Sequence, residues 1–283
     1  MIKNAIARAN FRKLRSSNLY RISKRWVIVN SYQRENRKLA WSWIFKRTEQ
    51  SNFYYELAEK NRGDLLSTIS LITGVKVETL RTYLNELIED VEIREHLKFF
   101  LSKKKETRDS IVGFGRREGW YLFVRAMKPK LVVETGVHHG VGACLIASAL
   151  LKNLQEGHMG RYLGTEINRS SGSLFTGKYS TVGSITYGDS CETLSGLETE
   201  IDIFINDSDH SAEYESKEYE TVQNLLSHRS VILGDNSHVT NSLRNFSEKY
   251  QRPYIFFKEI PRDHWYPGAG IGISPNHIPL TAN

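Results

Sequence analysis

Three ionisable side chains follow a short apolar stretch near the middle of the chain. In the sequence IDIFINDSDH, the apolar side chains within residues 201–205 are typical of a buried strand. Asp207, Asp209 and His210 follow it directly. Charged groups crowded at a strand end repel one another unless they share a partner. A bound cation would be such a partner, and a histidine near neutral pH can move a proton.

A second polar pair follows the next predicted strand. The sequence SVILGDNSH, residues 230–238, places Asp235 and Asn236 where that strand ends. Neighbouring parallel strands end at the same edge of a sheet, and ligands bind in the crevice outside those ends. We therefore expect Asp207, Asp235 and Asn236 to converge. Two carboxylates and a carboxamide form an all-oxygen set, which suits Mg²⁺ or another hard divalent cation better than zinc.

A glycine-rich loop occupies the start of the same region. The sequence LVVETGVHHGVGACLIASAL, residues 131–150, predicts a strand, a loop and a helix. Gly136, Gly140 and Gly142 allow sharp turns and a close approach to a ligand, and the following helix N-terminus suits a negative group. The dinucleotide fingerprint is G-x-G-x-x-G. This loop has G-x-x-x-G-x-G instead, with Glu134 two residues before the first glycine.

Two further acidic residues end the next two predicted strands. Glu166 ends the strand in YLGTEIN, and Asp189 follows the strand in ITYGDS. One carboxylate can accept hydrogen bonds from both neighbouring hydroxyls of a ribose. For Asp189 the alternative is a structural role, as the N-cap of a short helix at 190–195.

This loop resembles the first motif of the class I S-adenosylmethionine-dependent methyltransferases, E-x-G-x-x-x-G-x-G. In that family an acidic residue at the second strand end holds the cofactor's ribose, and one at the third often contacts adenine. The resemblance therefore implies a cofactor site formed by the loop and the acidic residues after it. Its residues are Glu134, Gly136, Gly140, Gly142, Glu166 and Asp189.

The later acidic residues resemble those of the divalent-metal-dependent O-methyltransferases, in which an Asp and an Asp-Asn pair hold the metal. The 28 positions between Asp207 and Asp235 fit that layout. The catechol and caffeoyl-CoA type has a Lys as general base three residues after the first Asp. This chain has His210 there, as in the macrocin and mycinamicin sugar O-methyltransferases. The resemblance covers roughly 110–275 and implies a metal held by Asp207, Asp235 and Asn236.

The implied chemistry is methyl transfer to a hydroxyl, with His210 as the catalytic base. A sugar hydroxyl is a weak nucleophile, and bound Mg²⁺ would lower its pKa. A histidine can then remove the proton near neutral pH. The sulfonium already activates the methyl group, so the protein mainly aligns the two reacting atoms. Asp209 is counted with the cofactor site as a contact to the cofactor's amino group, and orientation of His210 is an equal alternative.

Strand-like and helix-like segments alternate after residue 130, which predicts an α/β fold with a parallel sheet. The predicted fold is a Rossmann-like seven-stranded sheet with a terminal antiparallel hairpin, preceded by a helical N-terminal extension. Helices are predicted near 141–154, 211–227 and 238–250. The predicted strands are Leu131–Thr135, Arg161–Ile167, Ser184–Tyr187, Ile201–Ile205, Ser230–Leu233, Tyr254–Ile260 and Gly270–Ser274.

Three regions are predicted: a basic, aromatic-rich arm at 1–50, a helical extension at 51–109 and the methyltransferase domain at 110–283. In the extension, apolar residues spaced by three and four predict a helix at roughly 77–101. The net charge of +7 conceals an uneven distribution. The first fifty residues hold thirteen Lys or Arg and two acidic residues, which gives +11, and the remainder carries −4.

The arm has three interpretations. Cations with aromatic rings suit an anionic membrane surface or another anionic partner, an Arg-rich start suits a transit peptide, and a solvated basic surface is the third. No apolar run approaches the roughly 20 residues of a membrane span, and no secretory signal pattern is present. Cys144 and Cys191 make no disulfide framework, so we expect a cytoplasmic protein, with peripheral membrane attachment as the alternative.

The sequence thus predicts a Mg²⁺-dependent O-methyltransferase that uses S-adenosylmethionine and acts on a sugar, a glycoside or another small natural product. One alternative is a cephalosporin-hydroxylase-like enzyme of other chemistry on the same fold. A non-haem iron site there would need two His and a carboxylate, which the Asp-Asp-Asn set does not supply. The other is a non-catalytic protein that binds membranes or anions through 1–50. Nucleic acid is not an expected partner, and homo-oligomerisation is left open.

Overall fold

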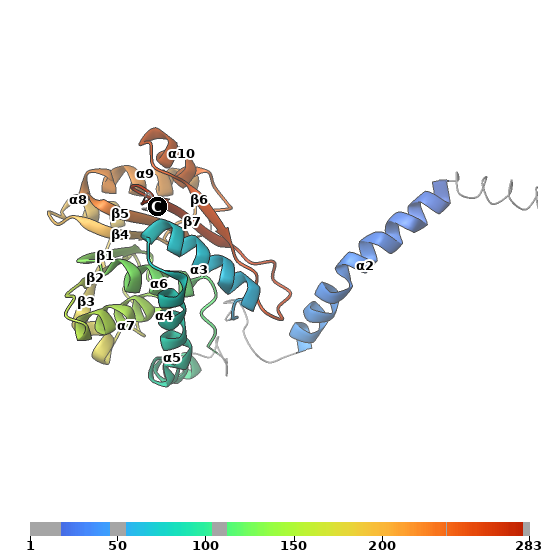
Figure 1. Cartoon of the computed structure of the whole chain (residues 1–283), viewed down its shortest axis with the longest axis horizontal. Helices are drawn as coiled ribbons and strands as arrows, with labels where there is room; N and C mark the ends of the chain where they lie inside the picture. Colours follow the sequence, from blue (N-terminus) through green and yellow to red (C-terminus); the bar gives the residue numbers. More distant parts are fainter. Residues whose placement is uncertain (1–17, 46–54, 104–111, 236, 280–283) are drawn as a thin grey trace, which may run out of the picture. The chain divides into compact units, whose positions relative to one another are not determined.

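The computed structural model describes residues 18–45, 55–103, 112–235 and 237–279 (Figure 1). The chain divides into two compact units. A small unit holds residues 1–47 with 263–266, and a large unit holds 48–262 with 267–283. The predicted region boundaries after residues 50 and 109 both lie outside the described residues and stay predictions.

A seven-stranded sheet forms the centre of the large unit, in the order β3-β2-β1-β4-β5-β7-β6. Strands β1 to β5 pair in parallel, and β7 runs antiparallel to both β5 and β6. This confirms the predicted Rossmann-like sheet and its terminal antiparallel hairpin. The strands are β1 (Leu131–Thr135), β2 (Arg161–Glu166), β3 (Gly183–Tyr187), β4 (Ile201–Asn206), β5 (Leu226–Asp235), β6 (Ile255–Lys258) and β7 (Gly270–Pro275).

Two layers of helices cover the sheet, because successive side chains of a strand point to opposite faces. Val132 and Ile203 share a core with helices α3 to α7, whereas Val133 and Phe204 share a second core with α8 to α10. The first layer consists of α3 (Glu59–Thr73), α4 (Val77–Glu89), α5 (Val91–Lys103), α6 (Arg117–Met127) and α7 (Val141–Gln155). The second consists of α8 (Ser190–Ser195), α9 (Ala212–Val222) and α10 (Ser242–Lys249), and two 3₁₀ helices are η1 (Gly177–Val182) and η2 (Gln223–Leu225).

The helical extension before β1 differs from the prediction in one respect. The single helix expected at 77–101 is two helices, α4 and α5, separated at Asp90. The backbone of Asp90 is extended, and its Oδ1 accepts the N–H of Ile93 at 3.0 Å. Such side-chain bonds to the backbone compete with helix continuation. A buried ion pair between Arg62 and Glu118, 2.6 Å long, joins α3 to α6.

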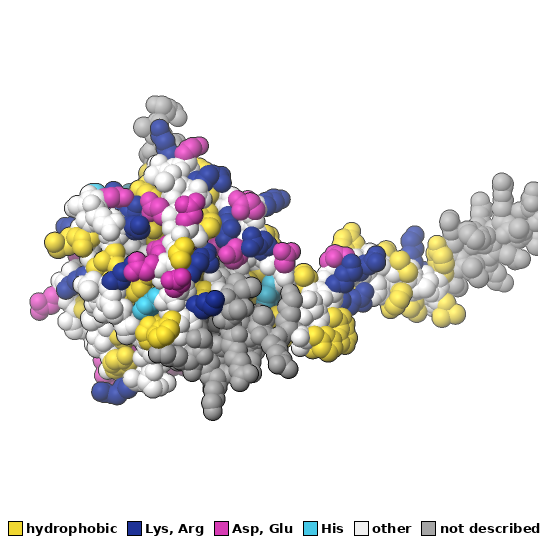
Figure 2. Space-filling view, turned by 90° about the horizontal axis from the view of Figure 1, so that it is seen from below, with side chains coloured by type: hydrophobic (Ala, Val, Ile, Leu, Met, Phe, Trp, Pro, Cys, Tyr) yellow, Lys and Arg dark blue, Asp and Glu magenta, His cyan; other side chains and the backbone are white. Residues whose placement is uncertain are grey.

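The small unit contains the long helix α2 (Asn18–Phe45). None of its side chains is buried. Figure 2 shows Lys and Arg side chains and hydrophobic side chains together on its surface. Within the same unit, the rings of Trp43 and Trp265 lie 5.2 Å apart. Among the described residues, no helix has both the length and the apolar composition that crossing a membrane requires.

Candidate active site

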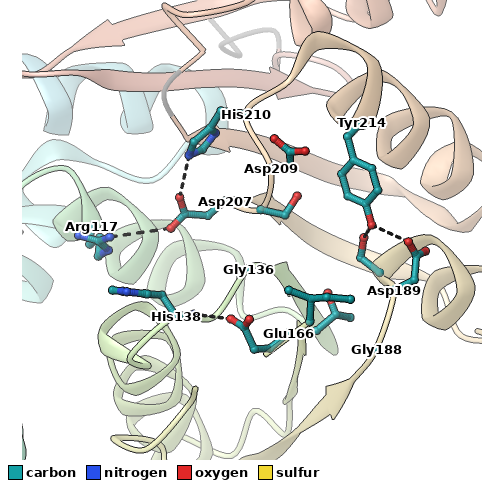
Figure 3. A pocket seen from close by; sticks show the side chains of 14 residues that line it. Arg117, Gly136, His138, Glu166, Gly188, Asp189, Asp207, Asp209, His210 and Tyr214 are labelled. Carbon is teal, nitrogen blue, oxygen red and sulfur yellow. Dashed lines mark hydrogen bonds and ion pairs between the residues drawn. The ribbon is translucent and has the colours of Figure 1, made fainter. Parts of the chain in front are cut away.

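A cavity of about 630 Å³ opens where strands β1 to β4 end, at the carboxyl edge of the sheet (Figure 3). This is the edge at which open α/β sheets bind ligands, and the volume lies in the range of small-molecule sites. The lining includes His138 of the glycine loop, and Arg117 and Tyr214, which the sequence did not single out as site residues. The predicted site residues that line it are Gly136, Glu166, Asp189, Asp207, Asp209 and His210.

The glycine loop between β1 and α7 brings the backbone close to the end of β4. Gly136 has φ +81°, and a Cβ there would collide with the backbone oxygen of Asp207. Only glycine tolerates both conditions. Gly140 forms the N-cap of α7, and a Cβ on Gly142 would collide with the ring of Trp120. Gly140 and Gly142 are not among the residues that line the cavity, so their visible role is to pack the loop.

Glu134 lies beneath this loop and does not line the cavity. Its side chain is buried and accepts a hydrogen bond from the hydroxyl of Tyr162. Burial raises the pKa of Glu134 to about 8, because the interior penalises the charged form. The predicted contact of Glu134 with a cofactor stays a prediction, and the structure places the residue as a support of the loop.

Glu166 and Asp189 form one end of the cavity and are held by neutral donors. Glu166 accepts the backbone N–H of His138 at 2.7 Å and that of Asn168 at 2.9 Å. Asp189 caps α8 through Oδ1, which accepts the N–H of Glu192 at 3.0 Å. Its Oδ2 accepts the hydroxyl of Tyr214, also at 3.0 Å. Asp189 therefore caps a helix and lines the cavity at once.

Asp207 and His210 form the other end, next to Asp235. One ligand atom from each of these three residues lies within 4.8 Å of the others. Asp207 lies 3.8 Å from His210 Nε2 and 3.8 Å from Arg117 Nη2. Burial and the neighbouring charge of Asp235 raise the pKa of Asp207 well above its usual range. Asp207 and Asp235 thus converge as the sequence predicted, whereas Asn236 lies outside the described residues.

Arg116 is the partner that the sequence did not predict. Its Nε and Nη2 donate to the two oxygens of Asp235, the second at 2.6 Å. Its Nη1 donates to Glu259 at 3.3 Å. Although burial alone would raise the pKa of Asp235, the charge and hydrogen bonds of Arg116 hold it at about 2. The residue stands 119 positions before Asp235, at the start of α6, where its sequence pattern gave no signal.

The residues present do not fit an open divalent-metal site. Mg²⁺ needs near-octahedral oxygen ligands at about 2.0–2.1 Å. Both oxygens of Asp235 are already engaged by Arg116, and Arg117 stands beside Asp207. A cation placed between Asp207 and Asp235 would meet these guanidinium charges unless Arg116 moved away.

Glu215 on α9 is the nearest acidic partner of the His210 ring. Glu215 Oε1 lies 3.6 Å from His210 Nδ1, and its carboxylate also accepts the hydroxyl of Thr240. This contact raises the pKa of His210 against the opposing effect of burial. Asp209 instead accepts the N–H of Ser211 at 3.0 Å, and Ser211 caps α9. Sequence reasoning did not assign Glu215, although a cap at Ser211 places it in the first turn of α9.

Residues 133–237 match the family model described as "Methyltransferase domain". These residues are therefore similar to a methyltransferase domain. The match covers the glycine loop, both ends of the cavity and Asp235, and it confirms the predicted enzyme class, a methyltransferase. A comparison with curated proteins gives no match.

Solved structures with a similar fold include O-methyltransferases. TomG from Streptomyces achromogenes, an O-methyltransferase involved in tomaymycin synthesis and solved with SAM, gives a TM-score of 0.51 at 15% identity and covers 69% of this chain and 95% of its own. A putative O-methyltransferase from Klebsiella pneumoniae gives 0.52 at 13%, covering 70% and 96%. A putative caffeoyl-CoA O-methyltransferase from Staphylococcus aureus gives 0.50 at 16%, covering 67% and 94%.

At these sequence identities the likeness shows the fold alone. The seven-stranded Rossmann-like fold that the sequence predicted is confirmed. The subtype that acts on sugars stays a prediction.

Proposed function

We propose that the methyltransferase domain transfers a methyl group from S-adenosylmethionine to a hydroxyl of a small molecule. One observation carries the proposal. A single cavity holds the two acidic residues of the glycine-loop end, Glu166 and Asp189, and the acid–base pair Asp207 and His210 at its other end. A cofactor bound at the first end would present its methyl group to an acceptor at the second.

The cofactor assignment follows the donors and acceptors of the first end. Glu166 would accept both ribose hydroxyls through lone pairs that its two backbone donors leave available. Asp189, with Tyr214, would face the adenine. Gly136 and His138 would lie along the methionine part, where the backbone approaches most closely. TomG, which has the same fold, was solved with SAM, and this supports the choice of cofactor.

The chemistry at the second end is a proton transfer coupled to a methyl transfer. His210 would accept the acceptor's hydroxyl proton, and Glu215 would hold the imidazole in position and stabilise its charged form. The hydroxyl oxygen forms a bond to the methyl carbon as the carbon–sulfur bond breaks. The products are a methyl ether, S-adenosylhomocysteine and the proton held on His210.

A sugar, a glycoside or another small natural product is the acceptor class we propose. The support is the histidine at the base position, shared with the sugar O-methyltransferases that the sequence resembles, and the O-methyltransferases of similar fold. The Mg²⁺ predicted from the sequence is not part of this proposal, since Arg116 engages both oxygens of Asp235.

The test is transfer of a labelled methyl group from S-adenosylmethionine to a panel of glycosides, sugar nucleotides and catechols. We expect formation of S-adenosylhomocysteine that depends on an acceptor, with an alkali-stable ether as the methylated product. Methylation of a nitrogen or carbon atom would contradict the proposed reaction. Absence of cofactor binding would contradict the proposal as a whole.

We propose separately that α2 contacts an anionic lipid surface. The helix carries six Lys or Arg residues against one acidic residue, Glu35. In a helix of this composition, the basic side chains bind anionic lipid headgroups and the apolar side chains enter the membrane interface. Its exposed large apolar side chains are Leu19, Ile22, Trp26, Val27, Ile28, Val29, Tyr32, Trp41, Ile44 and Phe45.

Sedimentation with lipid vesicles tests this contact. The protein should pellet with phosphatidylglycerol vesicles at low salt and remain in the supernatant with phosphatidylcholine vesicles. Replacement of Arg21, Lys24 and Arg25 by Gln should weaken the first interaction. Equal sedimentation with both vesicle types would contradict the proposed lipid contact. The cytoplasmic location stays a prediction.

A further inference from the structure

Arg116 is fixed at both its backbone and its side chain. It is the N-cap residue of α6, and its backbone N–H donates to Glu259 Oε2 at 3.1 Å. Glu259 in turn accepts the hydroxyl of Tyr55 at 2.7 Å and the backbone N–H of Ala269 at 2.6 Å. The guanidinium therefore projects from a position that Tyr55, before α3, and the loop between β6 and β7 hold in place.

The Arg116 guanidinium uses all three of its nitrogens on two buried carboxylates. Nε and Nη2 donate hydrogen bonds to the two oxygens of Asp235, and Nη1 donates one to Glu259. The exposed fractions are 13% for the side chain of Arg116 and 0% for those of Asp235 and Glu259. A planar guanidinium matches a carboxylate in this two-bond geometry, which a lysine cannot reproduce.

The Arg116 guanidinium lies where two neighbouring carboxylates bring negative charge together. Asp207 and Asp235 lie side by side at the ends of β4 and β5, and one atom of each lies within 4.8 Å of the other and of His210. Two such carboxylates, left alone in a buried site, would repel each other and could not both ionise. A divalent cation is one way to compensate for that charge. A fixed guanidinium is another, and it also restricts how the Asp235 oxygens can turn.

We propose that Arg116 supplies to Asp235, from within the chain, the positive charge that a divalent cation would bring there, and that methyl transfer at this site needs no metal. The proposal rests on the proposed methyl-transfer function. Arg116 is a positioning residue in this account, because it acts through Asp235. Arg116 holds both oxygens of Asp235, and Asp207 faces the cavity with Arg117 beside it.

Electron paramagnetic resonance of Mn²⁺ tests this directly, because free and bound Mn²⁺ give different signals. Wild-type protein should bind no Mn²⁺ at this site tighter than about 1 mM, the weak limit of protein cation sites. Arg116→Met removes the guanidinium at similar length and should create one Mn²⁺ site at least about 10-fold tighter. The double variant Arg116→Met with Asp235→Asn should lose that site again.

Two results overturn the proposal. One is a stoichiometric Mn²⁺ site in the wild-type protein that Asp235→Asn abolishes. The other is a folded Arg116→Met variant that binds Mn²⁺ no better than wild type. If Arg116→Met does not fold, the wild-type titration still decides. Arg116→Lys is the matched control, because it keeps the charge, loses the two-bond geometry and should not gain a Mn²⁺ site.

Titration of S-adenosylhomocysteine in the presence of EDTA separates this inference from the function on which it rests. Binding that is unchanged by EDTA, together with no Mn²⁺ site, supports both. Failure to bind S-adenosylhomocysteine, with or without Mg²⁺, would overturn the proposed function and leave the Mn²⁺ result to stand by itself. Methyl transfer that EDTA abolishes and Mg²⁺ restores would overturn the metal-free proposal alone.

Discussion

The two ends of the cavity hold their carboxylates by different means. Glu166 and Asp189 accept hydrogen bonds from backbone N–H groups and a tyrosine hydroxyl, all neutral donors. Asp207 and Asp235 face the guanidiniums of Arg117 and Arg116. Neutral donors leave lone pairs of a carboxylate available for bonds from a ligand, whereas a guanidinium beside it compensates its negative charge. The first arrangement suits binding, and the second suits a site where charge must stay balanced during a reaction.

Replacement of His210 by Ala should produce the largest effect and separate the two ends. General bases typically contribute about 10²- to 10⁴-fold to rate, so we expect methyl transfer to fall by that factor. Binding of S-adenosylhomocysteine should change by less than about 2-fold, because His210 lies at the other end of the cavity. The exposed His228 provides a control, and His228→Ala should alter neither quantity. A parallel loss of both would show that the ends are not independent.

Replacement of Glu166 by Ala should weaken cofactor binding, whereas replacement of His210 should lower the rate of methyl transfer. Hydrogen bonds to a charged group contribute about 1.5–3 kcal/mol each, so losing two ribose contacts should weaken S-adenosylhomocysteine binding at least about 100-fold. Calorimetric titration measures this. Glu192→Gln, an exposed carboxylate in the first turn of α8, should leave the affinity unchanged. An intact affinity in Glu166→Ala would mean that the cofactor does not lie where we propose.

Glu134 lies at neither end of the cavity. Its replacement should change the stability of the fold rather than cofactor binding. Its pKa is about 8 in the folded protein against a usual 4.5, so the folded state binds this proton more tightly than the unfolded state does. The stability that this proton contributes is therefore present below pH 4.5 and lost as the pH rises through 8. Each tenfold difference in proton affinity between the folded and unfolded states changes the free energy of unfolding by about 1.4 kcal/mol.

Denaturant unfolding of Glu134→Gln at pH 5, 7 and 9 measures this effect. Relative to wild type, the variant should gain stability steadily across this range, by a few kcal/mol in total. The exposed Glu200, changed to Gln, should show no such trend. A constant difference between Glu134→Gln and wild type at all three pH values would mean that Glu134 is ionised in the fold.

The smallest effect is expected at Asp209. Its carboxylate closes a turn onto the N–H of Ser211, and Ser211 itself caps α9. Asp209→Ala should cost about 1 kcal/mol of stability and change S-adenosylhomocysteine affinity by less than about 3-fold. A much larger loss of affinity would restore the sequence-based assignment of Asp209 to the cofactor's amino group.

The sequence predicted best what depends on local pattern. The sheet followed from alternating strands and helices, and Glu166 and Asp189 stand out because each ends a strand. Contacts set by the fold escaped prediction. Arg116 meets Asp235 only because the fold brings the residue before α6 to the end of β5, 119 residues away along the chain. The break at Asp90 depends on a single side-chain cap that apolar spacing does not reveal.

Calorimetric titration of wild-type protein with S-adenosylhomocysteine, once in EDTA and once in Mg²⁺, tests the central claim most directly. The claim is that this cavity binds the cofactor at its glycine-loop end and needs no metal to do so. We expect one molecule bound per chain, with the same affinity in both solutions. Absence of binding in both would contradict the account.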